Sequence, residues 1–295
     1  MLWCSVMSDR IEIGETLDGY RLEAHLGEGG SGQVFRARRD EGEPVALKRI
    51  GETKPGDAAR SRFLREAKAM NALSHPNVVK ILDFGICDRA PYLVMELLRG
   101  APLDAVLGRG RLEATLALQV ASQILDGLAY CHEHGVLHRD MKPANVFAAG
   151  RPGGGMHIKL LDFGLAKFLD ADRWGPQSVL TAEGTILGTP AYMAPEQGFG
   201  QIADMRSDVY STGVLLFELL SGVLPFEAQD RPSWIRAHAL DPIPSIVPLA
   251  PDLPSVQALD AVLQRALGKR PPERYEDAGA LRRAFLEALD AAPAS

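Results

Sequence analysis

Four polar side chains in the middle of the chain have types and spacing that suit chemistry on a phosphate. Asp140, Lys142 and Asn145 lie within six consecutive residues, and Asp162 follows after a glycine-rich stretch. A carboxylate can orient a hydroxyl group, an ammonium group can neutralise charge on a transferred group, and amide and carboxylate oxygens suit Mg²⁺. The set therefore suits the placement of a hydroxyl against a metal-bound phosphate. Each residue alone is equally compatible with a polar turn.

A second glycine-rich stretch, near the N-terminus, offers a place for phosphates. Residues 27–34 read Gly-Glu-Gly-Gly-Ser-Gly-Gln-Val and fit the pattern G-x-G-x-x-G-x-V. Glycines let a hairpin approach a triphosphate closely, so that backbone N–H groups face the phosphates. A dinucleotide-binding fold would need a helix directly after the glycines, whereas residues 34–38 continue as a strand. The pattern alone is equally typical of a flexible hairpin turn.

Lys48 and Glu66 form a second pair of candidates. Lys48 ends a strand expected at residues 45–48, and Glu66 lies on the helix expected next, at residues 58–73. The apolar positions of that helix make one stripe at helical spacing, and Glu66 falls on this stripe. A carboxylate that faces a core is costly unless a cation meets it. The cation is either Lys48 or Arg62, which lies four residues earlier on the same helix.

The composition indicates an ordinary soluble globular protein. The chain has 295 residues, of which 46% are hydrophobic and 24% charged, enough for one large domain or two lobes around a cleft. The net charge of −6 gives no reason to expect binding to nucleic acid or to a membrane surface. The three cysteines are widely spaced, which predicts reduced thiols in a cytoplasmic protein and no disulfide framework.

We expect no membrane-spanning segment. The most apolar run, residues 209–226, is interrupted by several polar residues and predicts a buried helix, since a span needs about 20 apolar residues. Residues 2–7 are apolar but too few for the core of a signal peptide, and no basic region precedes them.

Taken in order, the motifs resemble the catalytic core of protein kinases. The chain reads His-Arg-Asp at 138–140, Asp-Phe-Gly at 162–164 and Ala-Pro-Glu at 194–196. Lys142, together with Gly-Thr-Pro at 188–190, resembles the serine/threonine kinases. The sequences of these segments are similar to those of bacterial kinases of eukaryotic type, also called Hanks-type kinases. The resemblance extends over nearly the whole chain.

The resemblance implies an α+β fold with two lobes. A kinase domain at residues 20–288 would lie between tails at 1–19 and 289–295. Its N-terminal lobe, at about 20–96, would be a five-stranded antiparallel sheet with one main helix. A mostly helical lobe at about 99–288 would follow, with ATP in the cleft between the lobes. Expected strands are 20–26, 34–38, 45–48, 75–82 and 91–96; further expected helices are 116–134, 209–220, 233–240 and 276–288.

The resemblance also implies a role for each candidate in the catalytic loop. Asp140 would orient the acceptor hydroxyl and accept its proton, and Lys142 would neutralise charge on the transferred group. Asn145 and Asp162 would hold Mg²⁺, or Mn²⁺ in its place. His138 would be a packing residue and not a catalytic base.

ATP would be bound mainly by the smaller lobe. Lys48 would bind the α- and β-phosphates and pair with Glu66, which favours Lys48 over Arg62 as the partner. The nucleotide would otherwise meet the glycine loop, the bulky residue beside adenine, the segment that joins the lobes, and apolar side chains above and below the base. These residues are Leu26, Gly27, Gly29, Gly32, Val34, Ala46, Met95, Glu96, Leu98 and Phe147.

Four further residues would support the site. Glu196 would pair with Arg274, and Thr189 would hydrogen-bond the catalytic loop. Asp208, placed before an apolar helix, reads as the cap of that helix, and by resemblance it would also brace the backbone of the catalytic loop.

The expected activity is that of a non-specific serine/threonine protein kinase that acts on protein substrates. A pseudokinase that only binds ATP as a scaffold would normally lack one of Lys48, Asp140 or Asp162, and all three are present. A small-molecule kinase of related fold would not need residues 189–196 or Arg274.

The chain also carries a signal for regulation. Arg139 directly precedes Asp140, and a cation there invites an anion such as a phosphate on the chain itself. We expect autophosphorylation at Thr181, Thr185 or Ser178, with Thr181 preferred. Self-association for phosphorylation in trans would accompany it.

Overall fold

The computed structural model describes residues 12–29, 32–50, 57–87, 90–150, 155–163 and 190–291. The chain divides into two compact units. The described residues up to 72, together with 80–98, form the first unit; residues 73–79 and those from 99 onwards form the second. The first unit is rich in strands and the second is mainly helical, as expected. Among the described residues, no helix combines the length and the hydrophobicity needed to cross a bilayer.

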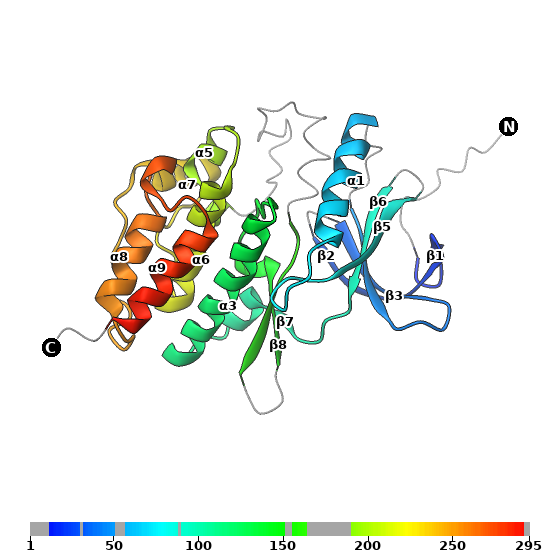
Figure 1. The fold of residues 1–295 in the computed structure, drawn as a ribbon, viewed down its shortest axis with the longest axis horizontal. Helices are drawn as coiled ribbons and strands as arrows, with labels where there is room; N and C mark the ends of the chain where they lie inside the picture. The colour runs from blue at the N-terminus through cyan, green and yellow to red at the C-terminus, as the bar shows by residue number, and fades with distance from the viewer. Residues whose placement is uncertain are drawn as a thin grey trace. The chain divides into compact units, whose positions relative to one another are not determined.

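The first unit is built on an antiparallel sheet of six strands in the order β1-β2-β3-β4-β6-β5 (Figure 1). The strands are β1 (Thr16–Leu17), β2 (Tyr20–Gly29), β3 (Gly32–Arg39), β4 (Val45–Arg49), β5 (Ile81–Cys87) and β6 (Ala90–Glu96). At the start of β2, Tyr20 and Leu22 are buried while Arg21 is exposed, because side chains alternate between the faces of a strand. The sixth strand, β1, was not expected; it pairs with the beginning of β2.

The strand expected at 75–82 begins only at Ile81, so this prediction is wrong at its start. The backbone N–H of Asn77 donates to His75 Nδ1 at 3.1 Å, which makes a turn. The side chain of Asn77 donates to Ile158 O at 2.8 Å, and Val79 N donates to Leu160 O at 3.0 Å. Residues 73–79 therefore belong to the second unit, because local and side-chain hydrogen bonds replace a strand ladder there.

One helix, α1 (Asp57–Asn71), packs against β5 and β6 of the first unit. Its buried side chains are Ala59, Phe63, Ala67 and Met70, which recur every three or four residues as the stripe predicts.

The side of the sheet away from this stripe has its own core. It is formed by Leu17, Tyr20, Leu22, Phe35, Ala37, Val45, Leu47, Tyr92 and Val94. Two tyrosines of this core carry hydrogen bonds: Tyr20 Oη donates to Asp83 Oδ2 at 3.0 Å, and Tyr92 Oη donates to the carboxylate of Asp18. A Cβ at Gly85 would lie 2.6 Å from Tyr92 Oη, so this position of β5 requires glycine.

The second unit contains a small antiparallel sheet and the longer helices. The sheet is β7 (Ala101–Pro102), β8 (Val146–Gly150) and β9 (Met156–Leu160), in that order. The helices are α2 (Leu103–Leu107), α3 (Ala114–Glu133), α5 (Pro195–Gly198), α6 (Met205–Ser221), α7 (Arg231–Leu240), α8 (Val256–Ala266) and α9 (Ala278–Asp290), with 3-10 turns η1 (Pro143–Asn145), η2 (Pro190–Tyr192) and η3 (Pro271–Glu273).

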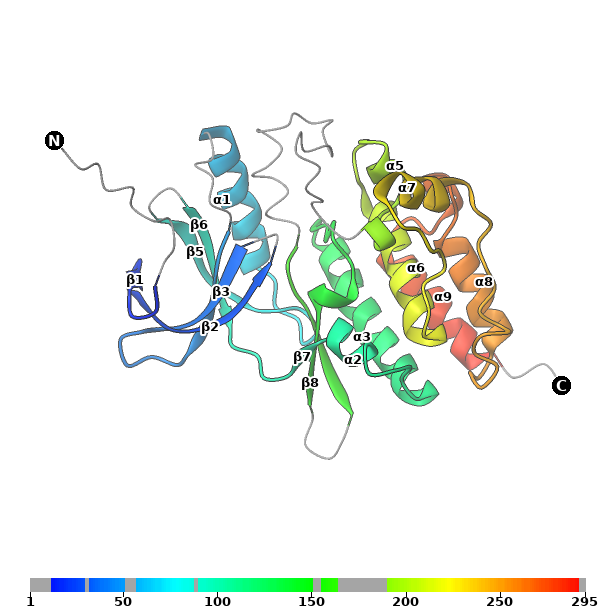
Figure 2. The same cartoon turned by 180° about the vertical axis from the view of Figure 1, so that it is seen from behind.

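Helix α6 is the central element of this unit, since it packs against α3, α8 and α9 (Figure 2). Its cap is Asp204, whose carboxylate accepts from Arg206 N at 2.8 Å and from Ser207 N at 3.3 Å. The prediction that Asp208 caps this helix is therefore wrong. The helix begins one turn earlier than expected, and Asp208 lies inside its first turn.

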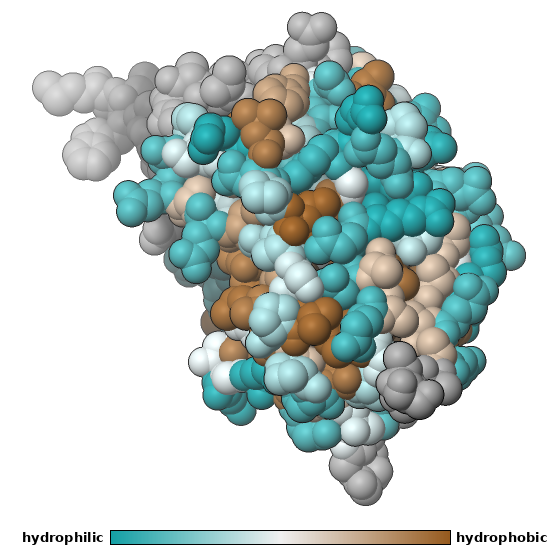
Figure 3. All heavy atoms as spheres, turned by 90° about the vertical axis from the view of Figure 1, so that its left-hand side faces the viewer, coloured by the Kyte–Doolittle hydropathy of each residue, from teal (hydrophilic) through white to brown (hydrophobic). Residues whose placement is uncertain are grey.

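Helix α8 was not predicted. Its buried side chains Val256, Leu259, Val262, Leu263 and Ala266 do repeat at helical spacing. The preceding residues, 225–254, are rich in proline, which disfavours long helices. On the end of the second unit that Figure 3 faces, hydrophobic side chains lie scattered between hydrophilic ones.

Candidate active site

The loop between α3 and β8 brings three of the predicted residues together. Lys142 Nζ lies 2.8 Å from Asp140 Oδ2. Asn145 Nδ2 donates to the same Oδ2 atom at 2.8 Å and to the Asp140 backbone O, also at 2.8 Å. The 3-10 turn η1 carries Asn145 back to Asp140 across a few residues, which is why side chains so close in sequence can converge. The Asp140 carboxylate is thus fixed by an ammonium group and an amide.

Asp208 supports this loop from α6, as the resemblance implied. Its carboxylate accepts from the backbone N–H groups of His138 at 2.7 Å and Arg139 at 2.6 Å. His132 Nε2 lies 3.1 Å from the same carboxylate. Burial acts to raise the pKa of Asp208, but the hydrogen bond from His132 and the contacts with His138 hold it below its usual range. Arg139 has a φ of 63°, a strained backbone that the two bonds to Asp208 impose.

His132 was missed by the sequence analysis. It is buried on α3, and its Nδ1 accepts from Ala278 N at the start of α9 at 3.1 Å, so the proton lies on Nε2 and is donated to Asp208. A histidine on the buried stripe of an amphipathic helix was the available signal, because such a ring needs polar partners.

His138 is a buried packing residue. Its ring lies 4.7 Å from the ring of Phe163, and Asp140 N donates to its Nδ1 at 3.3 Å. Burial lowers the pKa of His138, which keeps the ring neutral. The expectation that it is not a catalytic base agrees with this environment.

Asn145 and Asp162 lie at the same end of the β8–β9 hairpin. The last strand pair on this side is Val146 with Leu160, and Leu161 N donates to Asn145 O at 2.8 Å. Because the amide nitrogen of Asn145 is engaged by Asp140, its Oδ1 is the atom that could bind a metal ion. Amide and carboxylate oxygens fit Mg²⁺, which takes few protein ligands and completes its shell with water and phosphate.

In the first unit, four of the predicted nucleotide residues share one face of the sheet: Val34, Ala46, Lys48 and Met95. Val34 is paired with Lys48, and Ala46 with Met95. Paired residues point to the same face, and Ala46 and Lys48 are two positions apart on β4. Lys48 is only 4% exposed. The face opposite the tyrosine-lined core therefore presents the residues expected to meet ATP.

Glycine is required at one position of the β2–β3 hairpin. Gly32 has a φ of 128°, and a Cβ there would lie 1.9 Å from Arg49 O. Gly29 faces Gly32 in the ladder, and Gly27 faces Val34, so the hairpin has the form predicted for the glycine loop. Leu26, just before it, is an exposed apolar side chain.

Two further nucleotide candidates lie where the first unit ends. Glu96 closes β6, where its N–H donates to Lys80 O at 3.1 Å and its Oε1 accepts from Lys80 N at 2.8 Å. Leu98 follows outside any strand. Phe147 lies in the second unit, on β8.

The pair between Lys48 and Glu66 is not formed, although the structure describes both residues. Glu66 Oε1 instead lies 3.9 Å from Arg65 Nε. Arg62, the other cation considered, is not its partner in this structure either. Its side chain keeps 30% exposure, because Ala67 occupies the buried side of α1. A hydrated carboxylate pays no burial cost, so nothing compels it to reach a buried cation.

The expected pair between Glu196 and Arg274 is present and buried. Arg274 donates through Nη1 to Glu196 Oε1 at 2.7 Å and through Nη2 to Oε2 at 2.9 Å. Ser207 Oγ donates to Oε1 at 2.6 Å. Thr189 and the expected phosphorylation sites Ser178, Thr181 and Thr185 lie outside the described residues.

Comparison with known proteins gives concordant matches. The family model of the protein kinase domain matches residues 20–285. The serine/threonine-protein kinase pkn3 of Myxococcus xanthus is 40% identical over 283 residues, which cover 94% of this chain and 51% of the relative. The probable serine/threonine-protein kinase PknB of Lactococcus lactis is 36% identical over 90% of this chain and 42% of its own length. The chain thus spans about half the length of these relatives, or less.

A solved structure is also similar. The PknI kinase domain of Mycobacterium tuberculosis has a TM-score of 0.73 and 26% sequence identity, over 95% of this chain and 100% of that one.

Proposed function

Because the chain belongs to the protein kinase family, we propose that it transfers the γ-phosphoryl group of ATP to serine or threonine hydroxyls of proteins. The observation that carries this proposal is the cluster of Asp140, Lys142 and Asn145. The backbone just before this cluster is bound by the Asp208 carboxylate. A scaffold that only binds ATP is less well supported, since its sequence would normally lack one of the residues that act on the phosphates.

The reaction uses the geometry of the loop. The acceptor hydroxyl lies against Asp140, which takes its proton as the new bond from oxygen to phosphorus forms and the bond to the departing ADP breaks. Lys142, 2.8 Å from Asp140, neutralises charge that develops on the transferred group. Asn145 and Asp162 would hold Mg²⁺, which when bound neutralises the phosphate oxygens. Most of the rate enhancement comes from positioning and charge.

The nucleotide residues have separate roles in this proposal. Val34, Ala46 and Met95 would contact adenine from the sheet face of the first unit, and the glycine hairpin would cover the phosphates. Phe147 is a further proposed contact of the base. Lys48 would bind the α- and β-phosphates. We propose that Glu66 pairs with Lys48 only in the active form, since its hydrated carboxylate is free to turn from Arg65.

Incubation with Mg-ATP tests the proposed activity. Wild-type protein, Lys48→Met and Asp140→Asn are compared, and phosphosites are mapped by mass spectrometry. Phosphate on serine or threonine in the wild type alone is the expected result. Binding of Mg-ATP by calorimetry with no transfer to the chain or to protein substrates would instead support the scaffold.

We also propose that autophosphorylation regulates the protein, with Thr181 as the preferred site over Thr185 and Ser178. The cationic Arg139 beside Asp140 supports this, because a phosphate nearby would find a charge-assisted hydrogen bond there. The triple alanine variant is expected to lose about tenfold or more of its activity. Full activity of that variant, with no phosphate on residues 164–189, would contradict the idea. If autophosphorylation occurs between two molecules, its rate per molecule should fall when the protein is diluted. We also propose a cytoplasmic location for the protein.

A further inference from the structure

A buried histidine in α7 has no role in the proposed phosphoryl transfer. His238 is 1% exposed and lies in the last turn of this helix. Trp234 stacks on its ring at a centroid distance of 5.7 Å, while Tyr210 and Phe226 stand edge-on at 5.6 Å and 5.2 Å. Helix α7 packs against the turn η2, residues 190–192. The imidazole is thus locked by aromatic rings beside η2.

The hydrogen bonds of the ring define its tautomer. Tyr210 Oη lies 2.9 Å from His238 Nδ1, whereas Nε2 has no hydrogen-bond partner among the described residues. The carbonyl groups of Ala191 and Pro190 lie close enough to raise the pKa of the ring. Tyr210 Oη also donates to the backbone O of His238 at 3.3 Å, so its contact with Nδ1 does not by itself fix the proton. A ring nitrogen beside carbonyl groups suits them only when it is protonated, which assigns the proton to Nε2 and leaves Nδ1 as an acceptor. The ring therefore presents an unused N–H donor to η2.

The donor is neutral and its helix is fixed. Burial and the charge of Lys269 lower the pKa of His238 to about 4, against the smaller opposite effect of the carbonyls. Lys269 Nζ donates to His238 O at 2.9 Å and to Ala237 O at 3.4 Å, which secures the end of α7. Movement between the ring and the carbonyls must therefore come from η2.

The turn η2 leads into α5, which contacts the catalytic loop. Three residues beyond Ala194, Gln197 Nε2 donates to Arg139 O at 3.5 Å. Tyr192 Oη donates to Glu218 Oε2 on α6 at 2.6 Å. Residues 190–197 are thus tied to the catalytic loop, to α6 and to α7.

We propose that His238 is a positioning residue for the protein substrate, an inference that rests on the proposed function. Its Nε2–H bonds a carbonyl of Pro190 or Ala191 when substrate binds, and so holds η2 where the acceptor hydroxyl meets Asp140. A buried donor without a partner is unfavourable, so binding that supplies the partner is favoured. His238 touches neither substrate nor ATP and acts only through η2.

Three variants of the full chain separate this role from simple packing. His238→Gln keeps an amide donor near the place of Nε2, His238→Asn keeps one near Nδ1 only, and His238→Phe keeps the ring without a donor. The probe is the peptide that the wild type phosphorylates fastest in a degenerate serine/threonine library. His134→Phe is the control, because that histidine is exposed and its ring meets Tyr130 through a tilted ring contact and a hydrogen bond to the Tyr130 backbone O.

The phenylalanine and asparagine variants are expected to raise the peptide KM about fivefold, while glutamine stays within about twofold of wild type. Hydrolysis of ATP without peptide and the affinity for Mg-ATP should not change. Equal loss in all three variants, or parallel loss of ATP hydrolysis, would overturn the inference and leave His238 as a packing residue. A wild type that phosphorylates no peptide would overturn the proposed function itself. An active wild type with an unchanged His238→Phe would overturn the inference alone.

Discussion

Replacement of Asp140 by asparagine is expected to lower kcat by about 10²- to 10⁴-fold with little effect on folding or on ATP binding. The amide cannot take the proton of the acceptor hydroxyl. It keeps the size of the carboxylate and one oxygen, which can still accept from Lys142 and from Asn145, both 2.8 Å from Oδ2 in the wild type. Initial rates of phosphate transfer at saturating Mg-ATP measure the effect.

A matched control isolates the catalytic part of this loss. Asp252 is an exposed aspartate that pairs with Arg111 at 2.8 Å on the surface, so Asp252→Asn should change kcat by less than about twofold. Calorimetry should give Asp140→Asn an affinity for Mg-ATP within about threefold of wild type. If Asp140→Asn retained more than about a tenth of kcat, proton transfer to this carboxylate would not be part of the rate-limiting chemistry.

The catalytic loop could be predicted because its geometry is local. Asp140, Lys142 and Asn145 are close in sequence, and a single 3-10 turn decides whether their side chains meet. The glycine hairpin is similar, since Gly32 must be glycine to pass Arg49 O. The family followed from the order of these motifs, and the match over residues 20–285 confirms it.

Features that depend on how elements rotate or where they begin were harder to predict. The apolar stripe predicted for α1 is buried, but the residue buried on it is Ala67 and not Glu66. A small difference in rotation about a helix axis exchanges neighbouring residues, and the side-chain pattern alone does not fix it. Asp208 and Asp204 both suit a cap, and only the fold shows that Asp204 caps α6 while Asp208 receives the N–H groups of the catalytic loop.

The local sequence does not show which distant segments meet. His132 links Asp208 to Ala278 at the start of α9, and Ala278 lies 146 positions after His132 along the chain. Glu196 and Arg274 are paired across a separation of 78 residues, and that pair was predicted only through the family resemblance.

Loss of Arg274 is expected to destabilise the protein by about 3–5 kcal/mol. Arg274→Met would leave the buried Glu196 carboxylate without its counter-charge. The side chains of Arg274 and Glu196 are 0% and 5% exposed, so water cannot solvate the Glu196 carboxylate in place of Arg274. Arg274 also donates to the backbone oxygens of Gly268 at 2.7 Å, Arg206 at 3.0 Å and Lys269 at 3.1 Å. Urea unfolding at pH 7 measures the loss of free energy.

The dependence of this loss on pH identifies its cause. Burial acts to raise the pKa of Glu196, but the hydrogen bonds of Arg274 and Ser207 and the charge of Arg274 hold it below its usual range. A carboxylate whose pKa is lowered by folding stabilises the protein above its unfolded pKa, and the stabilisation is lost as pH falls through the folded pKa. In Arg274→Met the carboxyl group can take up a proton instead. The difference between variant and wild type should therefore shrink as pH falls from 7 to about 4.

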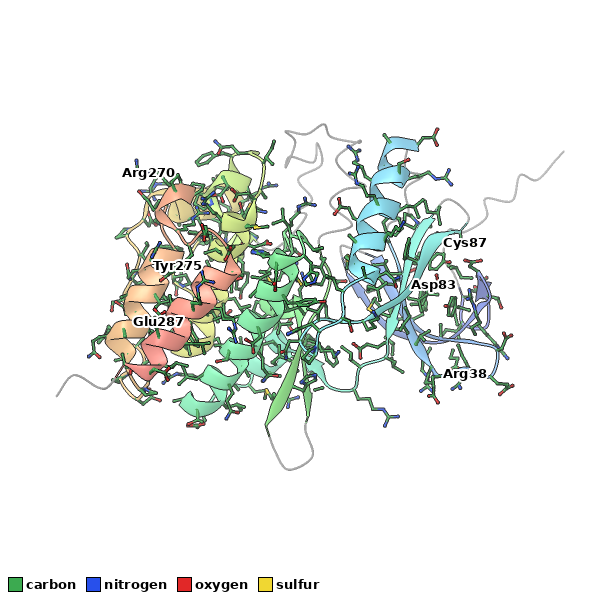
Figure 4. The ribbon with its side chains drawn as sticks, viewed as in Figure 1. Arg38, Asp83, Cys87, Arg270, Tyr275 and Glu287 are labelled. Carbon is green, nitrogen blue, oxygen red and sulfur yellow. The ribbon has the colours of Figure 1, made fainter. Side chains whose placement is uncertain are left out.

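A surface pair supplies the control. Arg270 and Glu273 are 2.6 Å apart, closer than the buried pair, but their side chains are 81% and 40% exposed, and Arg270 lies on the outside of the second unit (Figure 4). Arg270→Met should cost no more than about 1 kcal/mol, because water and salt screen an exposed pair. If Arg274→Met cost as little, or if its cost did not fall with pH, the stabilisation would come from packing of the long side chain and not from the buried charges. Distance alone would rank the two pairs wrongly, and burial is what gives the Glu196 pair its larger expected effect.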